Sequence, residues 1–302
     1  MNPQPIPSGN PHSTQSVHHL QAEHSEDWYD KMYNNRALVP NFAEHFSHWQ
    51  NESIKARLNQ RAILDVAYGR GTKESLDLFP AQNPHSPVVI FIHGGYWRSL
   101  DKSDHSFIAP TFNHMGATVV VANYDLCPNV TIPQITMQMV KCIAWVYKNI
   151  KHWGGDPSQI HLAGHSAGGH LVAMLMACHW SQYDAELPHN LIKNSLSISG
   201  LFDLTPLTKT PFLKDSLKLT DEDALRCSPA FFPAPETGKL ISVAGASESP
   251  EFVRQNHLIQ EAWGEHRVPV CEDLPGLDHF SILSDLTTPH SRLHDLAQSL
   301  LD

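Results

Sequence analysis

Long apolar runs are missing from this sequence: no stretch approaches the roughly 20 consecutive apolar residues that cross a bilayer. Residues 1–27 are polar and rich in Pro, Ser and His, and they lack the charged start and apolar core of a secretory signal. We therefore predict a disordered polar leader over residues 1–27, no membrane partner and a cytoplasmic protein.

Positive charge is also scarce. Lys and Arg number 21 against 31 Asp and Glu, which gives a net charge of −10, and no Lys/Arg cluster follows the pattern of a nucleic-acid surface. Nucleic acid is therefore excluded as an expected partner. We expect a small-molecule substrate as the partner and leave a homodimer open.

Paired cysteines are missing as well. The five cysteines are scattered and form no CxxC pair, so the sequence offers no structural zinc site. Most lie in apolar stretches, as expected of small core residues in a reducing compartment. His18 and His19 could hold a metal weakly, but a solvated leader is the favoured interpretation, and we predict neither metal nor cofactor. The cysteines are Cys127, Cys142, Cys178, Cys227 and Cys271.

The chain does contain a regular alternation of strand-like and helix-like segments. Residues 62–68 and 76–79 predict an antiparallel hairpin, and the apolar run at 88–92 is typical of a strand buried on both faces. Such alternation predicts an α/β fold with a mostly parallel, doubly wound sheet flanked by helices, which binds ligands at the carboxyl ends of its strands. Further strands are expected at 117–122, 160–163, 195–199, 240–244 and 268–271, and helices at 132–151, 170–176, 250–264 and 290–301.

The length of 302 residues and the hydrophobic content of 41% suit one large core, so we predict a single domain over residues 28–302. Residues 28–60 predict a helical N-terminal arm packed on that domain. Between residues 201 and 235 there are five prolines and no single apolar period, which favours a small cap insertion over the sheet edge. An extended surface loop is the alternative for this segment.

The most informative motif is Gly-His-Ser-Ala-Gly at residues 164–168, between a strand-like run and a helix-like stretch. Strand, sharp turn and helix form the nucleophile elbow of α/β hydrolases, where glycines permit the tight bend and Ser166 stands exposed above the sheet. A glycine-rich turn is the plain alternative, because such a three-position match arises by chance in roughly one chain of this length in ten. The other motifs decide between the two.

A second motif, His-Gly-Gly-Tyr-Trp at residues 93–97, directly follows the buried strand at 88–92. A glycine pair at this place lets backbone N–H groups approach a reacting carbonyl, as in the oxyanion loop of lipases and esterases. We predict that the N–H groups of Gly95, Tyr96 and Ala167 form an oxyanion hole. Two such loops in the expected order favour a serine hydrolase.

A serine hydroxyl needs a base and an acid that orients the base, and in this fold the acid and then the histidine follow the serine along the chain. The loop after the last predicted strand offers His279, and the loop after the preceding strand offers Glu248. Three other acids compete with Glu248. Asp278 adjoins the histidine and is typical of a turn, Glu251 suits the first turn of a helix, and Asp203 follows an earlier strand.

Six segments are distinctive in combination: YNNRALVP at 33–40, HGGYW at 93–97, LCP at 126–128, GHSAG at 164–168, SPEF at 249–252 and DHF at 278–280. Together they resemble the α/β-hydrolase type of kynurenine formamidase (arylformamidase), within the hormone-sensitive-lipase-like esterases. The likeness runs from about residue 33 to the C-terminus. Many esterases share the HGG and GxSxG loops, whereas YNNR, the Tyr-Trp after HGG and SPEF are more particular.

The resemblance implies a triad of Ser166, Glu248 and His279, with Gly95 and Tyr96 as oxyanion donors. The family pattern has Asp directly before Ser-Pro-Glu-Phe, whereas this chain has Glu248, whose extra methylene changes its reach. Relatives with this pattern also include esterases and amide or carbamate hydrolases. A separate, metal-dependent formamidase family has a histidine-rich ligand motif that this sequence lacks.

We therefore predict hydrolysis of an N-formyl arylamine such as N-formylkynurenine to formate and the free amine, through a formyl-serine intermediate. The predicted substrate contacts are Tyr96, Trp97 and His165, and ordinary packing is the alternative role for Tyr96 and Trp97. A carboxylesterase, or a hydrolase of other amides or carbamates, is the nearest alternative function. A non-catalytic binding protein on the same fold is the remote one.

Overall fold

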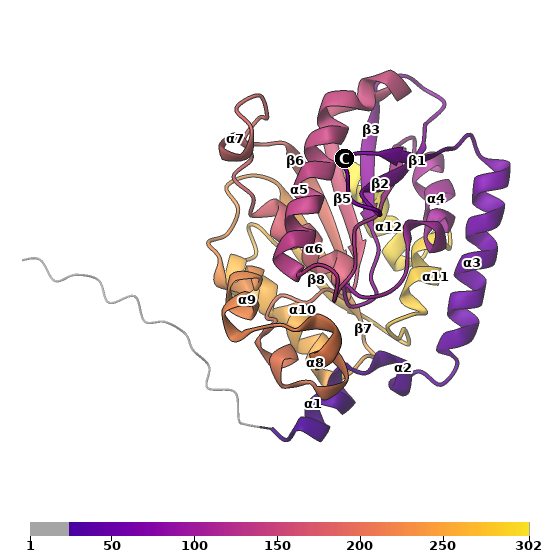
Figure 1. Cartoon of the computed structure of the whole chain (residues 1–302). Coiled ribbons are helices and arrows are strands. Elements are labelled where there is room, and N and C mark those ends of the chain that lie inside the picture. Colours follow the sequence, from indigo (N-terminus) through magenta and orange to yellow (C-terminus); the bar gives the residue numbers. More distant parts are fainter. Residues whose placement is uncertain (1–23, 302) are drawn as a thin grey trace, which may run out of the picture.

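The computed structural model describes residues 24–301. Within them, eight strands form one sheet in the order β1-β2-β4-β3-β5-β6-β7-β8 (Figure 1). β2 pairs antiparallel with β1 and β4, and the other neighbours pair in parallel. The antiparallel β1–β2 hairpin and the mostly parallel sheet are as the sequence predicts. The strands are β1 (Ile63–Ala67), β2 (Ser75–Phe79), β3 (Ser86–Ile92), β4 (Thr118–Ala122), β5 (Gly155–His165), β6 (Ile192–Ile198), β7 (Lys239–Gly245) and β8 (Val270–Leu274).

Both faces of the sheet are apolar and covered by helices. Successive side chains of a strand point to opposite faces, so a continuous apolar run supplies both cores. In β3, Val88 and Ile90 contact one core, and Val89 and Phe91 contact the other. Residues of α5, α6 and α10 complete the first core, and residues of α3, α4, α11 and α12 complete the second (Figure 1). These helices are α3 (Phe42–Asn59), α4 (Ala109–His114), α5 (Ile132–Asn149), α6 (Ala167–Met176), α10 (Pro250–Trp263), α11 (Ile282–Thr287) and α12 (Arg292–Gln298).

Two C-terminal elements differ from the sequence predictions. β8 begins at Val270 and not at residue 268, because Pro269 has no N–H to donate to a strand ladder. The single helix expected at 290–301 starts later, as α12, whose N-terminus is capped by the Ser291 hydroxyl accepting from the His294 N–H. A 3-10 helix, Ser299–Leu301, follows it.

The N-terminal arm consists of α1 (Glu26–Tyr33), α2 (Asn35–Leu38) and α3. The predicted leader boundary at residue 27 is wrong, because Ser25 caps a helix that begins at Glu26 and accepts from the Trp28 N–H. The rest of that leader, residues 1–23 with both of its adjacent histidines, lies outside the described residues.

The segment at 201–235 consists of short helices: α8 (Pro211–Leu217), α9 (Asp221–Arg226) and the 3-10 helices Thr205–Lys209 and Pro229–Phe231. α1 contacts α8, α10 and the 3-10 helix at Thr205–Lys209. α1 and this segment therefore lie side by side, at the lower end of the view in Figure 1. That the segment acts as a cap stays a prediction. The remaining helix, α7 (Trp180–Tyr183), follows α6.

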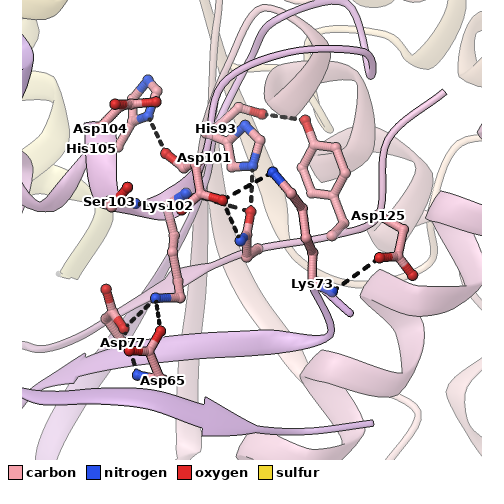
Figure 2. A network of polar contacts seen from close by, with 12 residues as sticks. Asp65, Lys73, Asp77, His93, Asp101, Lys102, Ser103, Asp104, His105 and Asp125 are labelled. Atoms are coloured by element: carbon pink, nitrogen blue, oxygen red, sulfur yellow. Dashed lines mark hydrogen bonds and ion pairs between the residues drawn. The ribbon is translucent and has the colours of Figure 1, made fainter. Parts of the chain in front are cut away.

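A buried ion pair joins the β1–β2 hairpin to the loop that follows β3. The Lys102 ammonium lies 2.7 Å from a carboxylate oxygen of Asp77 and 2.7 Å from one of Asp65 (Figure 2). The side chains of Lys102 and Asp77 are 6% and 1% exposed, so the charges of this pair depend on one another for solvation. The hairpin therefore holds the loop that also carries the His-Gly-Gly motif.

Lys102→Met should lower the free energy of unfolding by about 3–5 kcal/mol, because it leaves the Asp77 carboxylate buried without its cation. The matched control is Lys148→Met, since Lys148 is 41% exposed and its pairs with Asp184 and Glu186 lie at the surface; it should cost at most about 1 kcal/mol. Urea denaturation of both variants measures the difference. Equal losses would show that the buried pair does not stabilise the hairpin.

Candidate active site

Ser166 sits on a sharp turn between β5 and α6, with φ 57° and ψ −119°. Positive φ in a residue other than glycine costs of order 1–3 kcal/mol and must be held by its surroundings. Here the Ser166 N–H donates to the Ile198 carbonyl at 2.8 Å. A Cβ on Gly164 would lie 2.4 Å from the Gly168 oxygen, and one on Gly168 would lie 1.9 Å from the Ile92 oxygen. Only glycine fits at either position.

His279 and Glu248 complete a hydrogen-bonded chain that ends at Ser166. His279 Nε2 lies 3.0 Å from Ser166 Oγ, and His279 Nδ1 lies 2.6 Å from Glu248 Oε2. Because a carboxylate only accepts, Nδ1 carries the proton, and in the neutral ring Nε2 accepts from the serine hydroxyl. The Glu248 side chain is completely buried, and its Oε1 accepts from the Ser199 hydroxyl at 2.5 Å and the Gly245 N–H at 2.7 Å.

The three competing acids are each held elsewhere. Glu251 accepts from the Tyr33 hydroxyl at 2.6 Å and forms two hydrogen bonds with Arg254. Asp203 accepts from the backbone N–H and hydroxyl of Thr205 in a local turn. Asp278 accepts from the N–H groups of the two residues that follow His279, so it shapes the turn that carries the histidine. Of the four candidates, the structure brings only Glu248 to His279.

The glycine loop lies directly against the nucleophile turn. A Cβ on Gly94 would be 2.8 Å from the His165 carbonyl oxygen and 3.0 Å from Ser166 Cβ. Gly95 has φ 98° and Tyr96 has φ 50°, so the loop continues in left-handed conformations. Ala167 is the first residue of α6, where a backbone N–H has no acceptor within the helix. The N–H groups predicted to bind an oxyanion thus belong to two segments that meet at Ser166.

A buried polar network contacts this glycine loop through His93 (Figure 2). His93 Nδ1 lies 2.9 Å from the Gly94 carbonyl oxygen, and its Nε2 lies 3.0 Å from Asn123 Oδ1. Asn123 Nδ2 donates to Asp101 at 2.8 Å, and Lys73 contacts the same carboxylate at 3.1 Å. His93 links the loop to the network because both of its ring nitrogens are used. None of these residues was a site candidate from sequence except as part of the His-Gly-Gly motif.

Ser166 and His279 open into a pocket of about 320 Å³. Of the predicted substrate contacts, Tyr96 and His165 line it. Trp97 does not: it is completely buried, and its ring packs edge-on against His170 with the centroids 4.9 Å apart. The prediction of Trp97 as a substrate contact is therefore wrong, and its alternative role in packing fits. The full lining is Asn34, Asn35, Arg36, Phe46, Trp49, Gly95, Tyr96, Arg98, Ser99, Leu100, His165, Ser166, Phe212, His279 and Phe280.

Sequence reasoning missed most of this lining, because it comes from distant parts of the chain. Arg36 comes from α2, Phe46 and Trp49 from α3, and Phe212 from α8. In the sequence, the Tyr-Asn-Asn-Arg segment is distinctive only through its resemblance to kynurenine formamidases, although its last three residues line the pocket. The arm and the segment at 201–235 thus form two of the pocket's walls.

A second hydrogen-bonded chain ties the pocket wall to the arm. The Tyr96 hydroxyl donates to the Tyr33 carbonyl at 2.6 Å, and the Tyr33 hydroxyl donates to Glu251. Burial raises the pKa of both phenols well above the usual value, so both stay neutral donors. The Ser-Pro-Glu-Phe segment therefore acts structurally through Glu251, next to the acid that contacts His279.

Several buried histidines surround the site, and burial lowers the pKa of each. The pKa of His165, whose Nε2 lies 2.8 Å from the His279 carbonyl, falls well below its usual 6.5, first through burial and then through its electrostatic interaction with His279. Burial lowers the pKa of His93, and it lowers that of His105 to about 3. His161 and His170, elsewhere in the fold, fall to about 4 by the same cause. Burial therefore favours the neutral ring in all five.

Within residues 24–301, none of the helices combines the length and apolar character that crossing a bilayer requires. The same residues contain no grouping of three or more His, Cys, Asp or Glu side chains suited to hold a metal ion.

Comparison with known proteins identifies the family. The kynurenine formamidase of Danio rerio is 33% identical over 265 residues, which cover 85% of this chain and 88% of that protein. The chain belongs to the kynurenine formamidase family. The kynurenine formamidase of Drosophila melanogaster is 25% identical, over 82% of this chain and 85% of its own. The family model BD-FAE matches residues 76–223.

Solved structures share the fold of this chain. A structure described as a thioesterase from Silicibacter sp. TM1040 is 30% identical, with a TM-score of 0.79, and covers 90% of this chain and 98% of its own. An esterase from the archaeon Pyrobaculum calidifontis shares the fold, with a TM-score of 0.67 at 19% identity over 84% of this chain and 88% of its own. This family member is a hydrolase of the α/β-hydrolase fold, either a formamidase or an esterase.

The buried histidines predict a loss of stability in mild acid. Below pH 6.5 the unfolded chain takes up protons that the native histidines do not bind, so their contribution is present above pH 6.5 and is lost as the pH falls toward the native pKa values. Each adds a slope of up to about 1.4 kcal/mol per pH unit.

His105→Phe should therefore reduce the slope of unfolding free energy between pH 6.5 and 4.5 by about one proton relative to the unsubstituted protein. His114→Gln, at an exposed histidine, is the control and should leave the slope unchanged. Urea denaturation across this pH range measures both. An unchanged slope in His105→Phe would contradict the assignment of a neutral native His105.

Proposed function

We propose that this protein hydrolyses N-formyl arylamines of the N-formylkynurenine type, with Ser166 as the nucleophile. The observation that supports this most is the hydrogen-bonded chain from Glu248 through His279 to Ser166, at the floor of a pocket with aromatic walls. The membership of the kynurenine formamidase family agrees with it.

In the first half of the reaction, His279 Nε2 takes the proton of Ser166 as Oγ attacks the formyl carbon, and Glu248 stabilises the imidazolium through Nδ1. The N–H groups of Gly95, Tyr96 and Ala167 donate to the oxyanion that forms; loss of one such donor typically costs about 2.7–4 kcal/mol of transition-state stabilisation. His279 then protonates the departing arylamine nitrogen as the C–N bond breaks. Water, deprotonated by His279, attacks the formyl-serine; the bond to Ser166 Oγ breaks, His279 returns the proton to Oγ, and formate is released.

The shape of the pocket supports a small acyl group and an aromatic leaving group. A formyl group needs little space beside Ser166, so most contacts must form on the amine side. The rings of Phe46, Trp49, Phe212 and Phe280 line that space, and aromatic pairs add about 0.5–1.5 kcal/mol beyond the area they bury. An arylamine is therefore the leaving group that this lining fits best.

An esterase activity is the second candidate, because relatives over part of the chain include the esterase LipQ of Mycobacterium tuberculosis, 35% identical over 118 residues. The same nucleophile and base would serve both reactions. The purified protein should show a higher kcat/KM for N-formylkynurenine than for short 4-nitrophenyl esters. Rapid ester cleavage with negligible formamide turnover would overturn the formamidase proposal, and Ser166→Ala controls for background in both assays.

The role of Glu248 is tested by comparing two isosteric substitutions. Glu248→Gln should lower kcat by about 10⁴-fold, since it removes the charge that stabilises imidazolium and disturbs the His279 tautomer. Asp203→Asn should leave kcat nearly unchanged, because Asp203 is held in its own turn with Thr205. Steady-state kinetics on folded protein measures both. If only the Asp203 substitution abolishes turnover, Glu248 is not the acid of this site.

A further inference from the structure

Two arginines lie in the wall of the active-site pocket without an acidic partner. Arg36 and Arg98 both line it, and the described lining residues include no Asp or Glu. In a protein with a net charge of −10, a pair of cations facing a cavity beside the nucleophile is unexpected. Neither arginine appears among the ion pairs of the described residues.

The Arg98 guanidinium is held in place by contacts that involve no acidic side chain. Its Nη1 donates to the Phe212 carbonyl at 2.8 Å and to the Ser216 hydroxyl at 2.7 Å, and the guanidinium lies 5.3 Å from the Phe212 ring centroid. These contacts orient the Arg98 guanidinium against α8, and both hydrogen bonds are donated by Nη1. The guanidinium has five N–H groups, so Nε and Nη2 remain for a ligand.

Arg36 is exposed and packs on aromatic rings. Its guanidinium carbon lies 5.2 Å from the Phe46 ring centroid and 5.8 Å from that of Phe42. Burial, and then the charge of Arg36, lower the pKa of Arg98, so the two cations interact unfavourably. An anion between them would relieve both the lost hydration and the repulsion.

Unsatisfied donors add to the positive character of the pocket lining. Asn35 and Trp49 line the pocket and are 5% and 1% exposed. Asn35 Nδ2 and Trp49 Nε1 have no hydrogen-bond partner among the described residues. The pocket thus combines two guanidinium groups, unmatched N–H dipoles and aromatic walls, and its lining offers no carboxylate.

We propose that Arg98 and Arg36 form a carboxylate subsite, so that the preferred substrate carries an anionic group on its amine side. This inference rests on the proposed function. A formyl group has no anionic substituent, so the group that reaches the arginines must belong to the amine side. The planar guanidinium matches a carboxylate in a two-point hydrogen bond, which gives orientation as well as affinity. Arg98 directly follows the glycine loop, so binding there would also place the formyl carbon relative to the oxyanion donors.

The test compares anionic and neutral substrates of the same shape: the 2-, 3- and 4-isomers of formamidobenzoate against the matching formamidobenzamides. The unsubstituted protein should favour at least one benzoate isomer over its benzamide by about 10- to 100-fold in kcat/KM, the usual range for a hydrogen bond to a charged group. Arg36→Gln and Arg98→Gln should each remove about tenfold or more of that preference, mainly through KM. Arg98→Lys should recover only part, since it keeps the charge but loses the fork.

The control is Arg61→Gln, which removes an exposed positive charge outside the pocket and should leave the preference unchanged. Arg36 is exposed, so its substitution tests the subsite even if Arg98→Gln fails to fold. Equal losses on benzoates and benzamides would overturn the subsite while leaving formamide hydrolysis intact.

If the protein cleaves esters and no formamide, the proposed function fails and the subsite is tested separately. Benzoate should then inhibit phenyl acetate hydrolysis competitively and more strongly than benzamide, and Arg36→Gln should abolish that difference. Equal inhibition by the two compounds in the unsubstituted protein would reject the carboxylate subsite for either reaction.

Discussion

The close approach of α6 to the end of β3 is the constraint on which the site depends. The Gly168 backbone passes so near the Ile92 carbonyl that no side chain fits between them. This contact fixes the start of α6 beside the loop that leaves β3, so the strained Ser166 turn and the glycine loop at Gly94 meet. The strain at Ser166 is tolerated because the surrounding backbone determines it from several sides. Nucleophile and oxyanion donors are therefore products of one packing contact.

The remaining chemistry is attached to this contact by buried polar groups. Glu248 uses both carboxylate oxygens: one contacts His279, and the other accepts from Ser199 and Gly245. The acid that orients His279 is therefore itself held in place. The network through Asn123 holds the glycine loop from the other side, and its Asp101 lies next to the Lys102 that joins the hairpin (Figure 2). The β1–β2 hairpin, at one side of the sheet, is thus connected to the glycine loop through buried polar groups.

The sequence predicts those parts of the protein that local patterns determine. The sheet follows from apolar runs and their alternation with helices, and Ser166 and His279 follow from short motifs in a fixed order. Choosing Glu248 over Asp203 required three-dimensional contacts, because each acid follows a strand and only hydrogen bonds separate their roles. The pocket walls were least predictable. Phe212 and Arg36 come within reach of Ser166 only because α1 packs against α8, a contact that no local pattern encodes. Trp97 was misplaced for a related reason, since one turn of backbone sends it into the core while its neighbour Tyr96 lines the pocket.

Covalent labelling tests most directly whether Ser166 is the nucleophile. A fluorophosphonate reacts with an activated serine and marks the residue that attacks. Peptide mass spectrometry after labelling should find one adduct per chain on Ser166, with the adduct lost in His279→Ala. Ser99 lines the same pocket and offers the competing hydroxyl. An adduct on Ser99, or an unlabelled Ser166 in active protein, would contradict the account.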